Sequence, residues 1–320
     1  MTIAITRVTG AAKGLLLLLA LVVALASPCS GEKLYKSRDA SGNWHFSDRP
    51  PGGDTPVTVK QVRIGTPSSK VAIRNFGSSA RPLLYAVNGY HGPVEVEIAL
   101  QRSENVSTEP PLPARFLAPA AREVRTVRLW PTRGDQGWAY QYGYRAVPGD
   151  PAAVHRPEAP YRAPFPPGAS FFISQAFFGN YSHRHPQSEY ALDIAMPEGT
   201  PVCAARGGVV MEVASDFFTG GTDQEKYGQR ANMVRVLHDD GTMAVYAHLR
   251  LETAQVVPGT RVVSGQVLAE SGNTGYSSGP HLHFVVQKNV GMELRSIPFE
   301  LLGADGSSLT PETGMLLSPR

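Results

Sequence analysis

Residues 232–249 read NMVRVLHDDGTMAVYAHL, two apolar runs that flank a DDG turn at 239–241. Aspartate followed by glycine between alternating apolar residues is a strong short-range signal for a β-hairpin. Two further segments, TPVCAARGGVVMEV (200–213) and TRVVSGQVLAESG (260–272), each predict another pair of apolar strands. We therefore expect the C-terminal half of the chain to be a mostly antiparallel β-sheet domain.

The chain before this domain also has the pattern of β-structure. Residues 66–160 contain short runs such as PVEVEIALQ, separated by Gly, Pro and Ser, and no helical period persists. This pattern predicts a β-sandwich-like domain and a mainly β chain. We expect a proline-rich linker at 161–174, the C-terminal domain at 175–303 and a C-terminal tail at 304–320.

The first 26 residues predict an export signal. Arg7 and Lys13 precede the apolar block GLLLLLALVVALA (14–26), which is too short for a comfortable transmembrane helix and ends in small residues. We expect a signal peptide at 1–26 and an exported protein of the periplasm or cell envelope, or a secreted one. No transmembrane span is expected after its removal, and a lipid anchor at Cys29 is an alternative start of the mature chain.

Charge and cysteine content argue against two classes of protein. Removal of residues 1–26 leaves 28 basic against 27 acidic side chains, and no basic run stands out, so a nucleic-acid partner is not expected. The only cysteines are Cys29 and Cys203, so the chain is not a disulfide scaffold. Its stability must come from packing.

Residues 32–60 predict a small hairpin module, because aromatic and polar residues alternate across a turn at 39–42. The segment resembles a short module at the N-terminus of many exported proteobacterial proteins. That module has no assigned chemistry, so we expect no catalytic role for this part of the chain.

The closest pair of histidines lies in SGNTGYSSGPHLHFVVQ (271–287). Side chains alternate along a β-strand, so His281 and His283 are expected on one face while Leu282 points to the other. The glycines and serines before them predict a tight loop that lets the strand begin close to a substrate.

The same alternation places Tyr246 and His248 on one face of a neighbouring strand, and a further strand carries Asp193 in ALDIAMPEG (191–199). Neutral histidines and a carboxylate are typical ligands of a catalytic zinc, which keeps its fourth position for water. A histidine that does not bind the metal can act as general base or stabilise a developing oxyanion.

Residues 175–300 resemble zinc metallopeptidases of the lysostaphin and LytM type, which have the duplicated-hybrid-motif fold. The similar segments, in chain order, are DIAMPEGTPVCAARGGVV, NMVRVLHDDGTMAVYAHL and PGTRVVSGQVLAESGNTGYSSGPHLHF. The resemblance implies one Zn²⁺ held by a histidine, Asp193 and His283, with His248 and His281 as the catalytic histidines. It also implies an endopeptidase that hydrolyses the peptide stems and cross-links of peptidoglycan.

The first zinc ligand departs from the commonest form of this family, in which a histidine precedes the aspartate by four residues. That position is Glu189 here, and the upstream segment FGNYSHRHPQSEYALD offers His183 and His185. Similarity to a branch with Ser-His, a short insertion and Tyr-Ala-x-Asp favours His183. His185 is the alternative, and Glu189 is a less favoured one.

Other polar residues receive smaller roles. By the same resemblance Asn232 is a candidate for positioning substrate, and the loop at 216–230 is expected to wall the groove. His238 is expected to be structural or exposed, and no role is assigned to His91 or His155.

Two other functions share this sequence pattern. The first is a non-catalytic wall-binding module that activates another hydrolase, and the second is a secreted bacteriolytic protease. Binding modules of this fold typically lack the zinc ligands, so the residues present favour the enzyme. A contact of the 66–160 domain with the groove, inhibitory or targeting, is a further hypothesis.

Overall fold

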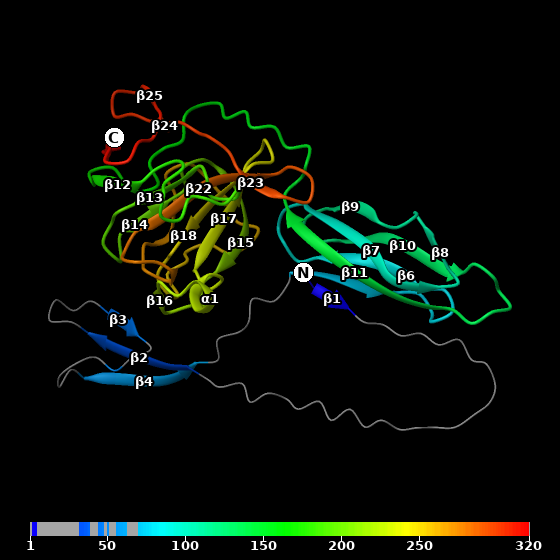
Figure 1. Ribbon diagram of the computed structural model, residues 1–320. Coiled ribbons are helices and arrows are strands. Elements are labelled where there is room, and N and C mark those ends of the chain that lie inside the picture. The colour runs from blue at the N-terminus through cyan, green and yellow to red at the C-terminus, as the bar shows by residue number, and fades with distance from the viewer. Residues whose placement is uncertain are drawn as a thin grey trace. The chain divides into compact units, whose positions relative to one another are not determined.

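The computed structural model describes residues 2–4, 32–38, 44–47, 50, 56–62 and 70–319 (Figure 1). It divides into two compact units. One comprises Met1–Ser30, Ser69–Gly89 and Pro93–Val147, and the other comprises Gly31–Ser68, Tyr90–Gly92 and Pro148–Arg320. None of the described residues lies in a helix that is long and apolar enough to cross a membrane.

The first unit consists of two four-stranded antiparallel sheets, as the predicted β-sandwich requires. One sheet has the order β1 (Thr2–Ala4), β11 (Ala139–Pro148), β7 (Val94–Glu104) and β9 (Ala114–Ala118). The other has the order β5 (Val71–Asn75), β6 (Leu83–Asn88), β10 (Glu123–Pro131) and β8 (Val106–Glu109). The hydroxyl of Tyr144 donates to the carbonyl of Val71 and so joins the two sheets.

The N-terminal module is a three-stranded antiparallel sheet. Its strands are β2 (Glu32–Arg38), β3 (Trp44–Ser47) and β4 (Val57–Val62), with β2 in the centre. The pairing of β2 with β3 matches the hairpin expected from the alternation. Apart from Thr2–Ala4, the expected signal peptide and Cys29 lie outside the described residues, so export and lipid anchoring stay predictions.

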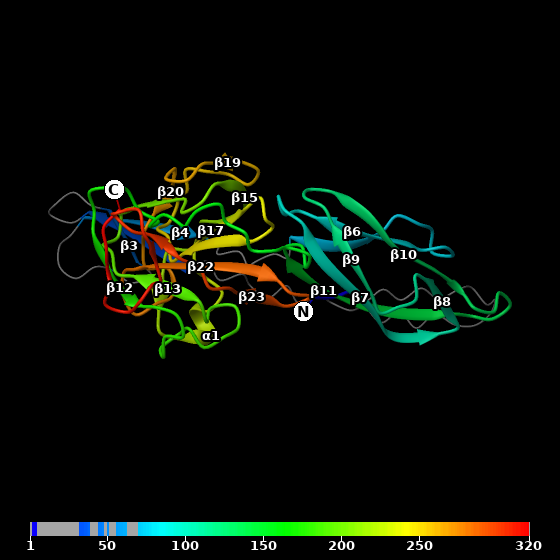
Figure 2. The same cartoon turned by 90° about the horizontal axis from the view of Figure 1, so that it is seen from above.

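The largest sheet of the second unit has nine strands, and β17 and β22 are seen along their length in Figure 2. The order is β19 (Arg261–Val262), β15 (Gly208–Ala214), β17 (Met233–Leu237), β18 (Met243–Ala247), β22 (Leu282–Asn289), β13 (Ala191–Ile194), β12 (Phe171–Gln175) and β26 (Leu316–Leu317), with β23 (Leu294–Ser296) paired to β22. Strands β17 and β18 form the predicted hairpin, and Gly241 supplies the positive φ of +81° that its turn requires.

The remaining described elements are short. They are β14 (Pro201–Cys203), β16 (Gly220–Gly221), the single-turn helix α1 (Gln224–Tyr227), β20 (Val267–Glu270), β21 (Gly275–Tyr276), β24 (Leu301–Leu302) and β25 (Ser308–Leu309). Two of the predicted strand pairs are wrong, because β14 pairs with β20 in a separate sheet while β15 pairs with β19 and β17.

The backbone between β14 and β15 explains this difference. The N–H of Ala204 donates to the carbonyl of Gln266, and the carbonyl of Ala205 accepts from the N–H of Arg162. The groups that would close a hairpin turn are therefore bonded to other segments, and the two strands diverge into different sheets.

The apolar face of the large sheet buries the core of the second unit. Leu192, Ile194 and Phe284 alternate with residues on the opposite face and are completely or almost completely buried. The segment expected as a linker contributes Tyr161 and Phe165 to the same core. Strand β26, from the expected tail, pairs with β12, so both segments are integral to the packed unit.

One buried hydroxyl provides a test of this packing. Tyr246 is 0% exposed, and its hydroxyl oxygen accepts from the N–H of Ala205 at 2.8 Å. We expect Tyr246→Phe to lower the free energy of unfolding by about 1–3 kcal/mol, because the buried N–H then has no acceptor. Chemical denaturation of the two proteins measures the difference, and equal free energies would contradict the role given to this hydrogen bond.

Candidate active site

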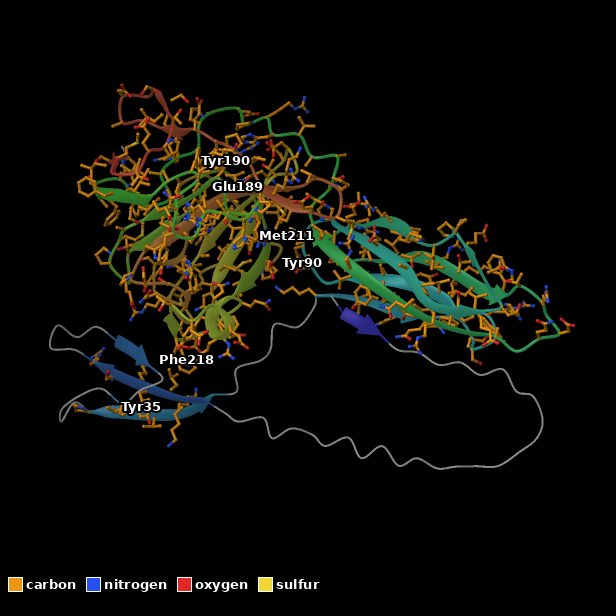
Figure 3. The ribbon with its side chains drawn as sticks, in the orientation of Figure 1. Tyr35, Tyr90, Glu189, Tyr190, Met211 and Phe218 are labelled. Carbon is orange, nitrogen blue, oxygen red and sulfur yellow. The ribbon has the colours of Figure 1, made fainter. Side chains whose placement is uncertain are left out.

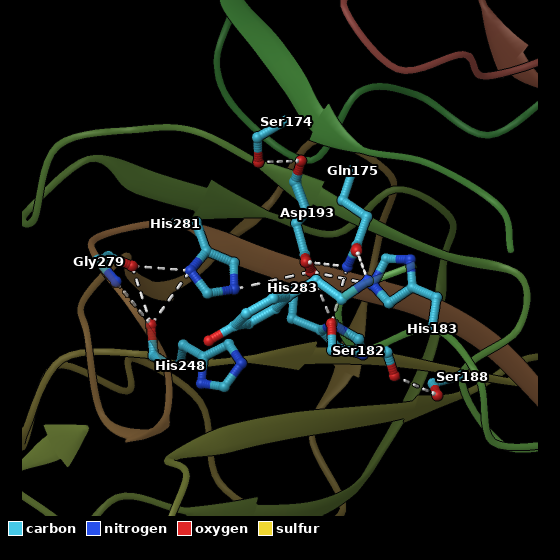
Figure 4. Close-up of polar contacts among 12 residues, drawn as sticks. Ser174, Gln175, Ser182, His183, Ser188, Asp193, His248, Gly279, His281 and His283 are labelled. Carbon is cyan, nitrogen blue, oxygen red and sulfur yellow. Dashed lines mark hydrogen bonds and ion pairs between the residues drawn. The ribbon is translucent and has the colours of Figure 1, made fainter. Parts of the chain in front are cut away.

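A groove of about 860 Å³ lies beside the ends of β13, β18 and β22. Four of the five favoured site residues line it, and the fifth, His183, is buried beside Asp193. Figure 4 shows these five around one common space: His183, Asp193, His248, His281 and His283. They come from four separate segments of the chain, which the sheet brings together.

Strand pairing places Asp193 beside His283. The two residues are direct partners in the register of β13 and β22, so their side chains leave the sheet on the same face. Nδ1 of His283 lies 2.9 Å from Oδ1 of Asp193. Nε2 of His183 lies 3.2 Å from the same oxygen, and the three ligand atoms offered by these residues lie within 4.8 Å of one another.

A turn before β13 positions His183. Its backbone N–H donates to the carbonyl of Gly179, and its Nδ1 lies 2.8 Å from the carbonyl oxygen of Ala176. A carbonyl only accepts, so Nδ1 must carry the proton and Nε2 keeps a free lone pair. The ring is buried, and Nε2 makes no hydrogen bond within the described residues. A buried nitrogen with a free lone pair beside a carboxylate is the state in which histidine binds a metal.

The donor set and its spacing fit zinc. Two atoms that each lie about 2.1 Å from a tetrahedral zinc ion are separated by about 3.4 Å. The distances from Asp193 Oδ1 to the nitrogens of His183 and His283, 3.2 and 2.9 Å, are close to this value. Two imidazoles and one carboxylate are also a known ligand combination for a catalytic zinc with one open position.

The two alternative first ligands lie elsewhere. His185 is exposed on the rim of the groove and contributes no atom to the cluster. Glu189, labelled in Figure 3, precedes β13, and its carbonyl oxygen accepts from the N–H of Phe178. Of the three candidates, His183 alone is brought to Asp193 and His283 in the part of the chain that the structure describes.

The Asp193 residue is only 8% exposed, yet its carboxyl is ionised near neutral pH. Burial raises its pKa, but the imidazoles of His183, His283 and His281 lower it more, so the pKa lies well below its usual range. An ionised carboxylate is the form that a metal ligand requires.

His248 and His281 complete the polar wall of the groove. Nδ1 of His281 donates to the carbonyl of Gly279 at 2.8 Å, while its Nε2 lies 3.6 Å from Oδ1 of Asp193. Nδ1 of His248 donates to the carbonyl of Thr274 at 2.6 Å. The two ring centroids are 4.6 Å apart. Each histidine therefore keeps an unprotonated Nε2 as an acceptor.

His248 reaches the groove by a route that strand alternation did not predict. Tyr246 faces the core and Ala247 faces the groove, so a regular strand would turn His248 toward the core as well. Instead β18 ends at Ala247, and His248 has a φ of +63°, in the left-handed region. The prediction that Tyr246 and His248 share a face is wrong, because this backbone turn redirects the ring.

In contrast, alternation correctly predicted the faces of the His-x-His strand. His281 and His283 line the groove, while Leu282 is completely buried in the core. Burial and the nearby rings of His281 and His283 lower the pKa of His248 to about 3. His248 is therefore a neutral imidazole near neutral pH.

The loop at 216–230 forms part of the groove wall, as expected, through Gln224 and Gly228. Asn232 holds this loop in place rather than contacting the groove. Its side chain accepts from the N–H of Phe217 and donates to the carbonyls of Phe217 and Leu249, and the residue is 0% exposed. Asn232 therefore does not line the groove, and a role in positioning substrate through this loop stays a prediction.

The other histidines lie away from the site. His238 is buried, and its Nδ1 donates to the carbonyl of Gly207, which agrees with the structural role expected for it. Burial lowers its pKa to about 4. His155 lies beside the hydroxyl of Tyr161, and neither His155 nor His91 lines the groove.

Sequence reasoning missed Gln175, whose Nε2 donates to Oδ2 of Asp193 at 2.8 Å. Gln175 and Asp193 are 18 residues apart and meet only because β12 pairs with β13. It also missed the two tyrosines that face each other at the groove, Tyr181 and Tyr276, whose rings stack with centroids 6.3 Å apart. No motif spacing marks these residues.

The segment that carries this site is similar to a known protein family. Residues 187–293 match the model of peptidase family M23, a range that includes Asp193, His248, His281 and His283 but begins after His183. Residues 15–75 match a domain of unknown function, DUF4124, which adds no chemistry.

Two curated relatives illustrate the similarity. The chain is 34% identical over 97 residues to the glycyl-glycine endopeptidase ALE-1 of Staphylococcus capitis. The aligned region covers 30% of this chain and 24% of that relative. It is 35% identical over 99 residues to the DD-carboxypeptidase/endopeptidase Mpg of Neisseria meningitidis serogroup B. That aligned region covers 31% of this chain and 20% of the relative. The chain thus spans a quarter or less of the length of these relatives.

Among solved structures, the catalytic domain of lysostaphin from Staphylococcus simulans is similar at 25% identity, over 40% of this chain and 86% of that domain. Its TM-score of 0.29 is too low to bear on the fold. The family match and the ordered sequence similarity, however, agree on the segment that carries the groove. Residues 187–293 therefore form a domain of peptidase family M23.

Proposed function

We propose that this protein is an exported zinc metalloendopeptidase that hydrolyses the peptide cross-links of peptidoglycan. The observation that carries the proposal is the cluster of His183, Asp193 and His283 with two further histidines in the same groove. A binding module needs a groove, but it does not need three metal ligands and two proton acceptors around one point.

His183, Asp193 and His283 would hold the metal through Nε2, Oδ1 and Nδ1. When bound at such a site, zinc supplies Lewis acidity, which acidifies a coordinated water and polarises the carbonyl of a scissile peptide bond. The fixed tautomer of His183 supports this assignment, because its free Nε2 lies 3.2 Å from the ionised carboxylate.

His248 and His281 supply the proton chemistry. The carbonyls of Thr274 and Gly279 hold each Nδ1, so each ring presents an unprotonated Nε2 that accepts a proton from the attacking water. Once protonated, the same nitrogen donates a hydrogen bond to the oxyanion or a proton to the leaving amine. The two histidines share these roles between them.

The proposed substrate and the proposed compartment rest on different observations. The two relatives are named as endopeptidases, and the resemblance of residues 175–300 to lysostaphin-type enzymes points to wall peptides as the substrate. Export to the periplasm or cell envelope rests on the signal peptide expected at 1–26. The groove, walled by Gln224 and the tyrosine pair, receives the peptide stem.

The ligand assignment has a direct test in zinc content. We expect His183→Ala to lose bound zinc, because it removes the Nε2 that lies beside Asp193. His185→Ala is the matched control and should keep one zinc per chain, because His185 is exposed on the rim. Elemental analysis of the purified proteins measures both. Full zinc in His183→Ala with loss in His185→Ala would reverse the assignment.

The hydrolytic role has a test in wall digestion. We expect the wild-type protein to release uncross-linked peptides from purified sacculi, and chelation to stop the release. His248→Ala and His281→Ala should each keep zinc but slow release by at least about 100-fold, the usual contribution of general acid–base catalysis. Separation of the released peptides by chromatography measures the rate.

His91→Ala is the control for these variants, since His91 does not line the groove and should leave the release rate unchanged. A zinc-loaded wild-type protein that cleaves no wall preparation would contradict the proposal and favour a non-catalytic wall-binding module.

A further inference from the structure

Gln175 makes three polar contacts that join two parts of the metal cluster. Its Nε2 donates to Oδ2 of Asp193 at 2.8 Å and to the hydroxyl of Ser182 at 2.7 Å. Its Oε1 accepts from the backbone N–H of Tyr181 at 2.9 Å. The Tyr181 N–H can only donate, so the amide oxygen must face it and the amide nitrogen must face the carboxylate.

A β-bulge brings Gln175 to this position. In the pairing of β12 with β13, Ile173 lies opposite Ile194 and Gln175 lies opposite Asp193, so β12 contains one extra residue between the two pairs. In a regular ladder Ser174 would lie opposite Asp193. Bulges redirect side chains in this way, and here the bulge replaces a short hydroxyl with a long amide.

The two oxygens of Asp193 have separate surroundings as a result. Oδ1 faces the nitrogens of His183, His283 and His281 at 3.2, 2.9 and 3.6 Å. Oδ2 accepts from Gln175. The carboxylate therefore offers one oxygen to the metal position while the other is already bonded to the protein.

Gln175 also holds the loop that carries His183. Tyr181 and Ser182, its other two partners, are the residues immediately before His183. The loop approaches so closely that a Cβ on Gly179 would lie 2.1 Å from Cγ of Gln175. A single side chain thus contacts both the carboxylate ligand and the segment that positions the first histidine.

We propose that Gln175 is a positioning residue for the metal site. It fixes Asp193 as a ligand through Oδ1 alone, and it sets the distance between Asp193 and the His183 loop. This role rests on the metal site proposed above. Removal of a hydrogen-bond partner that orients a metal ligand commonly weakens metal affinity by about 10–100-fold.

Gln175→Met tests the proposal, because methionine has a similar length and flexibility but cannot hydrogen-bond in this way. Tyr181 is exposed and Ser182 is half-buried, so water can replace the contacts that they lose. We expect the dissociation constant for Zn²⁺, measured by competition with a chromophoric chelator, to rise about 10–100-fold. Ser174→Ala is the matched control, since the Ser174 hydroxyl donates to the backbone carbonyl of Asp193 and not to its carboxylate.

A second measurement separates positioning from general stability. In the Co²⁺-substituted full chain, an Asp193 freed from Gln175 can bind through both oxygens, and visible absorption should weaken as the coordination number rises. Circular dichroism and thermal unfolding of the metal-free proteins establish that each variant is folded. If Gln175→Met does not fold, Gln175→Asn is the second test variant. Its shorter amide cannot reach Asp193, but it keeps a polar group at this position.

The outcomes are distinct. A folded Gln175 variant with weakened Zn²⁺ affinity and altered Co²⁺ absorption, beside an unchanged Ser174→Ala, supports the role. A folded variant with wild-type affinity and absorption overturns it while leaving the proposed function intact. Failure of the wild-type chain to bind Zn²⁺ at all would contradict the metal site itself, and this role with it.

Discussion

The Asp193 carboxylate is ionised although it is almost completely buried, and the site is organised around that constraint. A charge removed from water is stable only where donors or opposite charges surround it. Nδ1 of His283 is hydrogen-bonded to Oδ1 and the amide of Gln175 donates to Oδ2, while Nε2 of His183 and Nε2 of His281 also face Oδ1. The interactions that satisfy this carboxylate therefore also define the point at which ligands and proton acceptors converge.

The sheet supplies these groups from both sides of one strand. Strand β13 lies between β12, which carries Gln175, and β22, which carries His283. The next strand, β18, ends at the groove and delivers His248 through a residue in the left-handed region. Strand register sets the spacing of Gln175, Asp193 and His283, whereas His183 comes from a turn before β13 and His248 from the residue after β18.

Much of this arrangement was predictable, and the exceptions share a cause. Alternation placed His281 and His283 on one face, and the DDG turn identified the central hairpin. Alternation failed for His248, where the backbone leaves the strand, and for Gln175, which a bulge brings opposite Asp193. Local patterns predict regular strands, but bulges, left-handed residues and the choice of pairing partner depend on contacts between distant segments.

Asp193, His183 and His283 should together hold one zinc ion. X-ray absorption at the zinc edge of the zinc-loaded full chain tests this ligand set. We expect a four-coordinate shell of nitrogen and oxygen at about 2.0–2.1 Å, with outer-shell scattering from two imidazoles. A sulfur neighbour at about 2.3 Å, or a shell without imidazole scattering, would contradict it, because no sulfur belongs to this cluster.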